Sequence, residues 1–157
     1  ATTGRTHHRT PNIITSLELD PAEMEKRNIH LQKKYAEIEE NEVRFEELHC
    51  EDAEYLIVAF GSCARIAQKA MEMAREEGIK VGLLRPITLW PFPSKAIAAR
   101  AAQVKGILTV ELNAGQMVED VRLAVECKVP VEHFGRLGGI VPDPDEVITA
   151  LKEKLIK

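Results

Sequence analysis

The sequence is poor in aromatic residues, in cysteine pairs and in long apolar runs, and each shortage excludes a class of protein. Aromatic residues make up 4% of the 157 residues, so an apolar core must be built from Val, Ile, Leu, Ala and Met. No apolar run approaches the roughly 20 residues that a transmembrane helix needs. The formal net charge of -4 argues against nucleic acid as the main partner.

The three cysteines, Cys50, Cys63 and Cys127, are odd in number and include no C-x-x-C pair. This spacing argues against a zinc site or an iron–sulfur cluster made by this chain alone, and against a disulfide framework. We therefore expect a cytoplasmic protein in a reducing environment. Cys63 lies at a predicted helix start, which would stabilise a thiolate, but a small buried apolar residue is the favoured interpretation.

The first part of the chain is an acidic lead segment. Residues 20–54 hold twelve acidic residues and five basic ones. Asp20 as a cap, Pro21 at the first helical position and Glu23 in the first turn predict a helix over about residues 20–48. One narrow apolar stripe along it predicts packing against this domain or a partner chain, with a solvated charged helix as the alternative. The stripe consists of Met24, Leu31, Tyr35, Ile38 and Phe45.

From Tyr55 onward the sequence alternates between strand patterns and helix patterns. We therefore interpret residues 1–54 as an interdomain linker and residues 55–157 as the folded domain. The segments YLIVAF, KVGLL, GILTVEL and PVEHF are typical of strands in a parallel sheet, and helical patterns separate them. Right-handed crossovers place such helices on both faces. The predicted fold is α/β, a three-layer Rossmann-like domain with a mostly parallel sheet.

Three segments follow the ends of predicted strands, at the edge where open α/β sheets bind ligands or partners. A Gly-Ser turn offers backbone N–H groups to an anion, but GSCARI is neither G-x-G-x-x-G nor a P-loop, so a tight turn with a serine cap is the favoured interpretation. The RPITLWPFP stretch holds the only Trp, either as an interface anchor or as part of the core. An E-x-N-x-G-Q motif is either a ligand or partner site or ordinary turn chemistry. The sheet-edge and interface candidates are Gly61, Ser62, Arg85, Trp90, Phe92, Glu111, Asn113 and Gln116.

The residues predict no catalytic, cofactor-binding or metal-binding site in this chain. His7 and His8 are adjacent, and neighbouring side chains on an extended chain point in opposite directions. His133 lies in a predicted strand and is interpreted as a structural histidine. No nucleophile and base have the spacing of a triad, and no acidic cluster suggests magnesium.

The order of these segments resembles a known family. IVAFGSCARIAQKA, EEGIKVGLLRPITLWPFP and VELNAGQM are similar to the C-terminal domain of transketolase-like thiamine-diphosphate enzymes. The most similar are alpha subunits of 2-oxoacid:ferredoxin oxidoreductases. EMEKRNIHLQKKY resembles the segment before that domain, and Thr3-Gly4-x-x-His7 resembles a stretch at the end of the family's pyrimidine-binding domain. Beyond His7 the chain departs from the acidic and glycine residues usual in the family.

The resemblance implies that the whole enzyme oxidatively decarboxylates a 2-oxoacid to an acyl-CoA and reduces ferredoxin. It implies thiamine diphosphate, magnesium, iron–sulfur clusters and CoA, all held by domains or subunits outside this chain. This chain would be a non-catalytic assembly domain, inactive alone, that begins inside a longer polypeptide and packs against other subunits or further copies of itself. The substrate implied is branched-chain, such as 3-methyl-2-oxobutanoate (2-ketoisovalerate), with 2-oxoglutarate as a close second.

Three other interpretations stay open from the sequence. The chain could be an independent Rossmann-like module that binds a nucleotide or CoA at the Gly61 turn. It could be the C-terminal domain of a transketolase or of a 2-oxoacid dehydrogenase that works without ferredoxin. It could also be a purely structural dimerisation domain.

Overall fold

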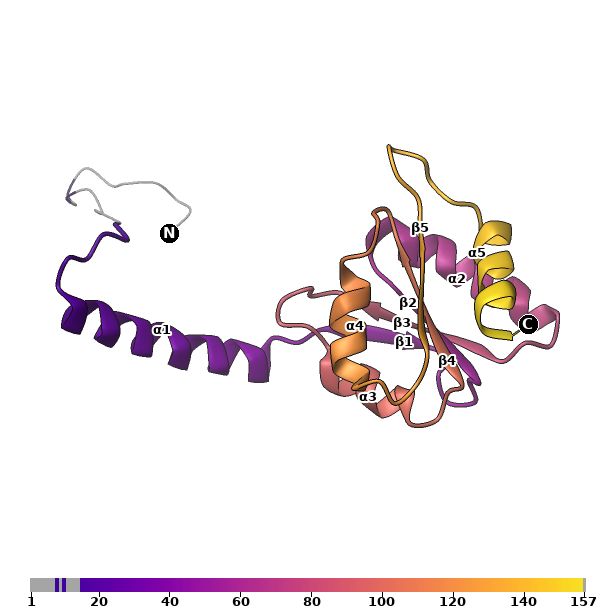
Figure 1. Cartoon of the computed structure of the whole chain (residues 1–157), viewed down its shortest axis with the longest axis horizontal. Coiled ribbons are helices and arrows are strands. Elements are labelled where there is room, and N and C mark those ends of the chain that lie inside the picture. The colour runs from indigo at the N-terminus through magenta and orange to yellow at the C-terminus, as the bar shows by residue number, and fades with distance from the viewer. Residues whose placement is uncertain (1–7, 9, 11–14, 157) are drawn as a thin grey trace. The chain divides into compact units, whose positions relative to one another are not determined.

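The computed structural model describes residues 8, 10 and 15–156 (Figure 1). The chain divides into two compact units, residues 1–37 and residues 38–157. The resemblance carried by Thr3-Gly4-x-x-His7 lies outside the described residues.

The first unit contains most of one long helix, α1 (Pro21–Asn41). The Asp20 carboxylate caps it, because Oδ1 accepts hydrogen bonds from the backbone N–H groups of Ala22 at 2.8 Å and Glu23 at 3.4 Å. The predicted helix start is therefore confirmed. The predicted end near residue 48 is wrong, because residues 45–48 form a strand of the second unit's sheet.

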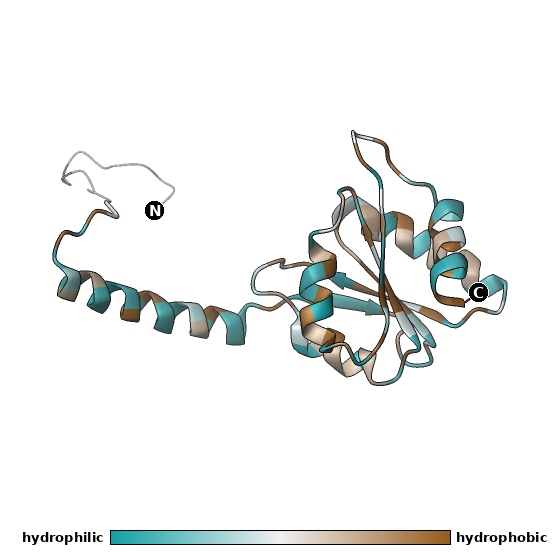
Figure 2. Ribbon diagram, viewed as in Figure 1, coloured by the Kyte–Doolittle hydropathy of each residue, from teal (hydrophilic) through white to brown (hydrophobic). Residues whose placement is uncertain are grey.

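The apolar stripe of α1 is consequently shorter than predicted, since Phe45 belongs to that strand. Its remaining members alternate with hydrophilic residues along the helix (Figure 2). Met24, Leu31 and Ile38 are half-buried, and no described residue of α1 is fully buried. A helix of this composition gains most of its stability from packing rather than from propensity.

The second unit is a five-stranded sheet in the order β1-β3-β2-β4-β5, with β1 antiparallel to β3 and the other strands parallel. Helices α2 and α5 pack on one face, and α3 and α4 pack on the other (Figure 1). The strands are β1 (Phe45–Leu48), β2 (Tyr55–Ala59), β3 (Val81–Pro86), β4 (Gly106–Glu111) and β5 (Val131–Gly135). The helices are α2 (Gly61–Glu76), α3 (Ser94–Ala101), α4 (Met117–Val125), α5 (Pro144–Leu151) and a final π-helical turn, Lys152–Ile156.

The central strand β2 shows why its sequence is apolar without alternation. Ile57 faces the core beneath α2 and α5, whereas Leu56 and Val58 face the core beneath α3 and α4. All three are buried, because helices cover both faces of the sheet. The α/β fold with a mostly parallel sheet is confirmed.

The antiparallel strand β1 was missed from the sequence, and polar side chains hold it in place. The Arg100 guanidinium of α3 donates two hydrogen bonds to the Glu47 carboxylate, at 2.8 and 2.6 Å. This contact lowers the pKa of Glu47 from its ordinary value, although partial burial opposes the shift. Arg85 donates to Glu46 at 2.8 Å, and Gln103 donates to the Cys50 carbonyl at 2.9 Å. A charged edge strand of this kind also resists pairing with other sheets.

Two glycines in the strands give a matched test of this packing. A Cβ atom at Gly82 would lie 2.9 Å from the His49 carbonyl oxygen, which the backbone fixes. A Cβ atom at Gly106 would meet only a terminal methyl of Leu155, at 2.8 Å. We expect Gly82→Ala to lower the free energy of unfolding by about 1–3 kcal/mol in urea titrations, and Gly106→Ala to lower it less. Equal losses of unfolding free energy would show that the backbone between β1 and β2 shifts as easily as the Leu155 side chain.

Candidate functional site

The carboxyl ends of the four parallel strands meet at one edge of the sheet, which we call the carboxyl edge. Strand β2 is followed there by residues 61–62, β3 by residues 87–93, β4 by residues 112–116 and β5 by residues 136–143. Because β1 is antiparallel, its first residue, Phe45, pairs with Pro86 at the same edge. The candidate residues from the sequence therefore gather at this edge.

Glu111, at the end of β4, is 1% exposed, and its carboxylate is bound by the chain's own backbone. Its oxygens accept hydrogen bonds from the N–H groups of Met117 at 2.8 Å, Val118 at 3.0 Å and Gln116 at 3.2 Å. These are the N–H groups that the first turn of α4 leaves unpaired, and a negative charge there is favoured by the helix dipole. Glu111 thus acts inside the domain, whereas the sequence placed it among the interface candidates.

His133 of β5 completes this buried cluster. Its Nδ1 lies 3.4 Å from Glu111 Oε1 and 3.3 Å from Thr109 Oγ1. Thr109 and His133 are direct partners in the parallel pairing of β4 and β5. These contacts fit the interpretation of His133 as a structural histidine, which stays a prediction. The local pattern could not show its partners because they come from the neighbouring strand.

The turn after β4 explains the spacing of the E-x-N-x-G-Q motif. The Asn113 Oδ1 atom accepts the backbone N–H of Gly115 at 2.7 Å, and Gly115 has a φ of +114° that favours glycine. Asn113 is half-buried and Gln116 is exposed. A Cβ atom at Gly135 would come within 2.2 Å of the Asn113 carbonyl oxygen, so β5 approaches the turn closely. Most of the motif therefore builds the turn, and Gln116 is its outward-facing member.

The turn after β2 exposes Gly61 and Ser62 and buries Cys63. Gly61 begins α2 with a φ of +57°. The predicted serine cap is wrong, because Ser62 already lies inside the helix and the helix start has no side-chain cap. Burial raises the pKa of the Cys63 thiol, and the nearby Glu111 carboxylate raises it further. Both causes disfavour a thiolate, so the interpretation of Cys63 as a small buried apolar residue is confirmed.

The loop after β3 divides its aromatic residues between core and surface. Phe92 packs against the core beneath α3 and α4, whereas Trp90 is 55% exposed, next to exposed Leu89. The Thr88 hydroxyl donates to the Pro91 carbonyl at 2.9 Å and so stiffens the loop. Arg85 is engaged by Glu46 of β1. Trp90 therefore keeps the geometry of an interface anchor, and Arg85 and Phe92 support the edge from within.

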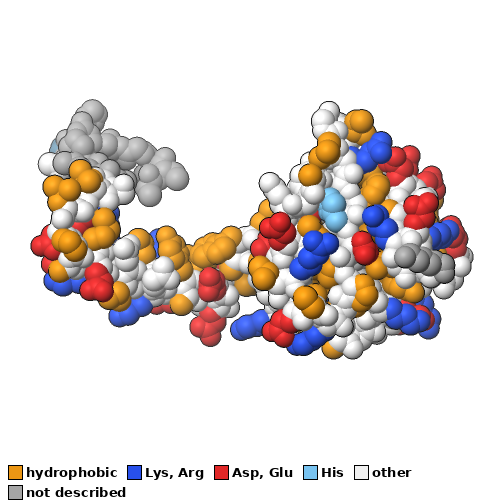
Figure 3. Space-filling model, viewed as in Figure 1, with side chains coloured by type: hydrophobic (Ala, Val, Ile, Leu, Met, Phe, Trp, Pro, Cys, Tyr) orange, Lys and Arg blue, Asp and Glu red, His pale blue; other side chains and the backbone are white. Residues whose placement is uncertain are grey.

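The loop after β5 holds exposed apolar residues that the sequence analysis missed. Leu137, Ile140 and Val141 are each more than half exposed. Gly138 and Gly139 both have positive φ, and the Ile140 N–H donates to the Leu137 carbonyl at 3.3 Å. This is a tight turn that projects beyond the sheet (Figures 1 and 3). The sequence signal that could have indicated this turn is the pair Gly138-Gly139 between the apolar residues Leu137 and Ile140.

Exposed large apolar residues of the second unit concentrate at the carboxyl edge. The opposite edge carries charged pairs, including Glu54 with Lys80 and Lys105, and Glu77 with Lys152. Among the described residues of the second unit, Leu123 on α4 is the only exposed large apolar residue that lies away from the carboxyl edge. An apolar patch on one edge of a soluble domain marks an interaction surface. We define the carboxyl-edge patch as Phe45, Ile87, Leu89, Trp90, Leu112, Leu137, Ile140 and Val141.

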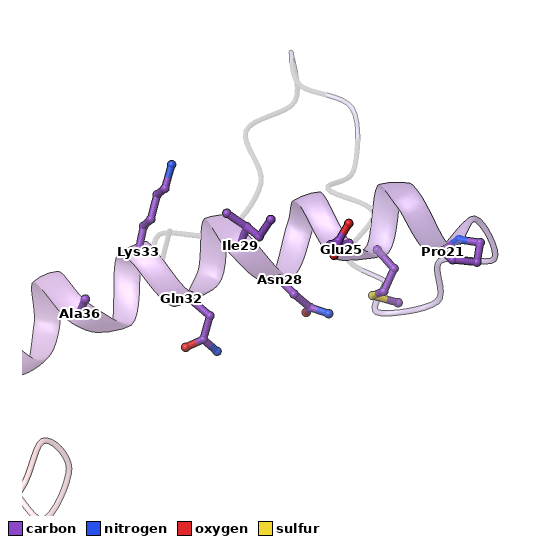
Figure 4. A pocket seen from close by; sticks show the side chains of 8 residues that line it. Pro21, Glu25, Asn28, Ile29, Gln32, Lys33 and Ala36 are labelled. Carbon is purple, nitrogen blue, oxygen red and sulfur yellow. The ribbon is translucent and has the colours of Figure 1, made fainter.

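A shallow open groove also runs along α1, and it is lined by apolar and polar side chains together. Ile29, Lys33 and Glu25 point to one side of the helix and Asn28 and Gln32 to the other (Figure 4), so they do not converge on a ligand. Across the described part of the chain, no group of three metal-ligating side chains comes together. The described helices are also too short or too polar to cross a lipid bilayer.

Replacing the buried carboxylate tests its structural role. We expect Glu111→Ala to lower the free energy of unfolding by about 2 kcal/mol or more, because buried N–H groups of α4 lose their acceptor. Glu119→Ala, an exposed acid in the first turn of the same helix, should change it by no more than about 0.5 kcal/mol. Urea titration of both variants measures the difference. Similar small losses would mean that water replaces the carboxylate.

Comparison with known proteins places this geometry in a family. The model of the pyruvate:ferredoxin oxidoreductase core domain II matches residues 53–147. The ketoisovalerate oxidoreductase subunit VorB of Methanothermobacter thermautotrophicus is 49% identical over 142 residues, which are 90% of this chain and 40% of that subunit. The 2-oxoglutarate synthase subunit KorA of Archaeoglobus fulgidus is 32% identical over 143 residues, 89% of this chain and 40% of that subunit. The chain thus spans about two fifths of these relatives.

Solved structures show the same fold. The 2-oxoglutarate:ferredoxin oxidoreductase from Magnetococcus marinus, solved with 2-oxoglutarate, coenzyme A and succinyl-CoA bound, aligns with a TM-score of 0.74 and 26% identity. The alignment covers 87% of this chain and 24% of that one. A split-gene transketolase aligns with a TM-score of 0.62 and 21% identity over 72% of this chain and 41% of that one, which shows the fold alone. The chain therefore belongs to the family of the pyruvate:ferredoxin oxidoreductase core domain II, within subunits of 2-oxoacid oxidoreductases.

Proposed function

We propose that this chain is the assembly domain of a 2-oxoacid:ferredoxin oxidoreductase subunit that acts on a branched-chain 2-oxoacid such as 3-methyl-2-oxobutanoate. The higher identity to ketoisovalerate subunits than to 2-oxoglutarate subunits supports the substrate class. The concentration of exposed apolar residues at the carboxyl edge is the observation that carries the assembly role.

The chemistry of such an enzyme belongs to parts outside this chain. The described residues do not fit an iron–sulfur cluster, since Cys50 and Cys63 are buried in the cores on opposite faces of the sheet. Burial raises the pKa of the Cys50 thiol to about 11, and the thiol donates to the Leu83 carbonyl at 3.4 Å. Thiamine diphosphate, magnesium, the clusters and CoA would therefore be held by the remaining domains and subunits, with ferredoxin as the electron acceptor in the cytoplasm.

The sequence candidates divide into two roles within this proposal. Gly61, Ser62, Trp90 and Gln116 are exposed at the carboxyl edge and would meet neighbouring domains. The others shape the edge from within: Arg85, Phe92, Glu111 and Asn113.

The whole complex provides the test of the proposed reaction. Purified anaerobically with all its subunits, it should reduce viologen in the presence of CoA and 3-methyl-2-oxobutanoate, and less efficiently with 2-oxoglutarate or pyruvate. A preference for 2-oxoglutarate would overturn the substrate class. An intact complex without 2-oxoacid-dependent reduction would overturn the proposed function and favour a nucleotide-binding or CoA-binding module.

The contribution of the carboxyl edge is tested by its outward-facing amide. Gln116→Ala should leave the folding of this domain unchanged and weaken its contact with the neighbouring domain about tenfold, the effect of one interfacial hydrogen bond. Asn113→Ala should weaken this contact and also destabilise the turn, because Gly115 loses its acceptor. Urea titrations of this chain alone and within the complex measure both effects, with exposed Glu119→Ala as the control. If the Gln116→Ala variant makes this contact as strongly as the wild type, Gln116 does not lie in the interface.

A further inference from the structure

The carboxyl-edge patch has two lobes at opposite ends of the sheet, and Leu112, which follows β4, lies between them. The first, the β1 lobe, consists of Phe45, Ile87, Leu89 and Trp90. The second, the tip lobe, consists of Leu137, Ile140 and Val141 beyond β5. Because β1 and β5 are the outer strands of five, and neighbouring strands lie about 4.8 Å apart, the lobes are separated by roughly the width of the sheet, about 19 Å. An α-helix is about 10 Å across, so one helix laid along the strand direction at either lobe would leave the other uncovered.

The β1 lobe is formed where the polypeptide reaches the sheet. The Arg44 carbonyl accepts the N–H groups of Ile87 at 2.9 Å and Thr88 at 3.1 Å, and the Arg44 N–H donates to the Thr88 hydroxyl at 3.0 Å. The loop that carries Trp90 is therefore bound to the residues just before β1. Since β1 runs antiparallel, everything that precedes it in the polypeptide arrives at the carboxyl edge.

The tip lobe is held in a fixed shape before any partner arrives. At its base, the Arg136 N–H donates to the Glu111 carbonyl at 3.2 Å, and the Arg136 guanidinium pairs with Glu146 at 3.3 Å. At its other end, Asp143 and Glu146 form a reciprocal capping box at the start of α5. A loop ordered in this way loses little conformational entropy on binding.

We propose that both lobes dock against one apolar surface of the domain that precedes β1 in the same polypeptide. This inference rests on the proposed function, because it places the chain within a longer subunit. Three observations support an intramolecular partner. The polypeptide enters at this edge, the exposed large apolar residues of the second unit other than Leu123 lie there, and this chain matches only 40% of the length of its ketoisovalerate relatives. The remaining length supplies a domain-sized surface that can span the sheet.

Thiol accessibility in the full-length subunit, purified without its partner subunits, tests the proposal. In a Cys127→Ser background, single cysteines replace Leu89 in the β1 lobe, Val141 in the tip lobe, or Leu123 on α4 as the control. Leu123 is 77% exposed and lies outside the patch. We expect a maleimide to label Leu89→Cys and Val141→Cys at least tenfold more slowly than Leu123→Cys, with rates independent of protein concentration.

Each other result would overturn the proposal. Slow labelling only after the partner subunits are added would assign the patch to another subunit. Slow labelling that disappears on dilution would assign it to a second copy of the same subunit. Fast labelling in both the subunit and the complex would show that the patch is not an interface. Viologen reduction by the reassembled variants, measured with 3-methyl-2-oxobutanoate, separately reports whether the proposed function holds.

Discussion

The carboxyl edge of this domain depends on the buried carboxylate of Glu111. A buried carboxylate needs hydrogen-bond donors, and three N–H groups at the start of α4 supply them, while His133 Nδ1 lies 3.4 Å from Glu111 Oε1. The same contacts join β4 to the start of α4 and to β5. They leave Gln116 pointing outward and give the tip lobe a firm base, since Arg136 binds the Glu111 backbone. Glu111, which the E-x-N-x-G-Q motif placed at a possible ligand-binding edge, thus connects β4 to the start of α4.

The antiparallel strand β1 brings the residues that precede it to the carboxyl edge. Leu48 of this strand packs against the core beneath α2 and α5, and the ion pair between Glu47 and Arg100 ties the strand to α3. Because that pair is only about one quarter exposed, it is screened less than a surface pair. A single strand that runs against its neighbours brings the residues just before it to the carboxyl edge, where the exposed apolar residues gather.

The family relationship and the physical character of the edge support the same view of function. The described residues contain no cluster of metal-ligating side chains, and Cys50 and Cys63 are buried in the cores on opposite faces of the sheet. The structure shows an α/β domain with an apolar edge. In the proposed function, this edge would contact neighbouring domains, and the cofactors would be held elsewhere. Trp90, exposed on a stiffened loop, has the features of a binding anchor.

Local sequence determined the elements whose patterns are complete within a few residues. The apolar run of β2, the capped start of α1 and the helix after Gly61 all follow from short-range periodicity or from a cap. The tertiary structure alone decided that FEEL becomes strand β1, because its pairing with β3 joins residues about forty positions apart. It likewise decided that Glu111 faces inward while Gln116 faces outward, and that three apolar residues project from the last loop. Burial of a charge and pairing of an edge strand depend on partners distant in sequence, which no local pattern specifies.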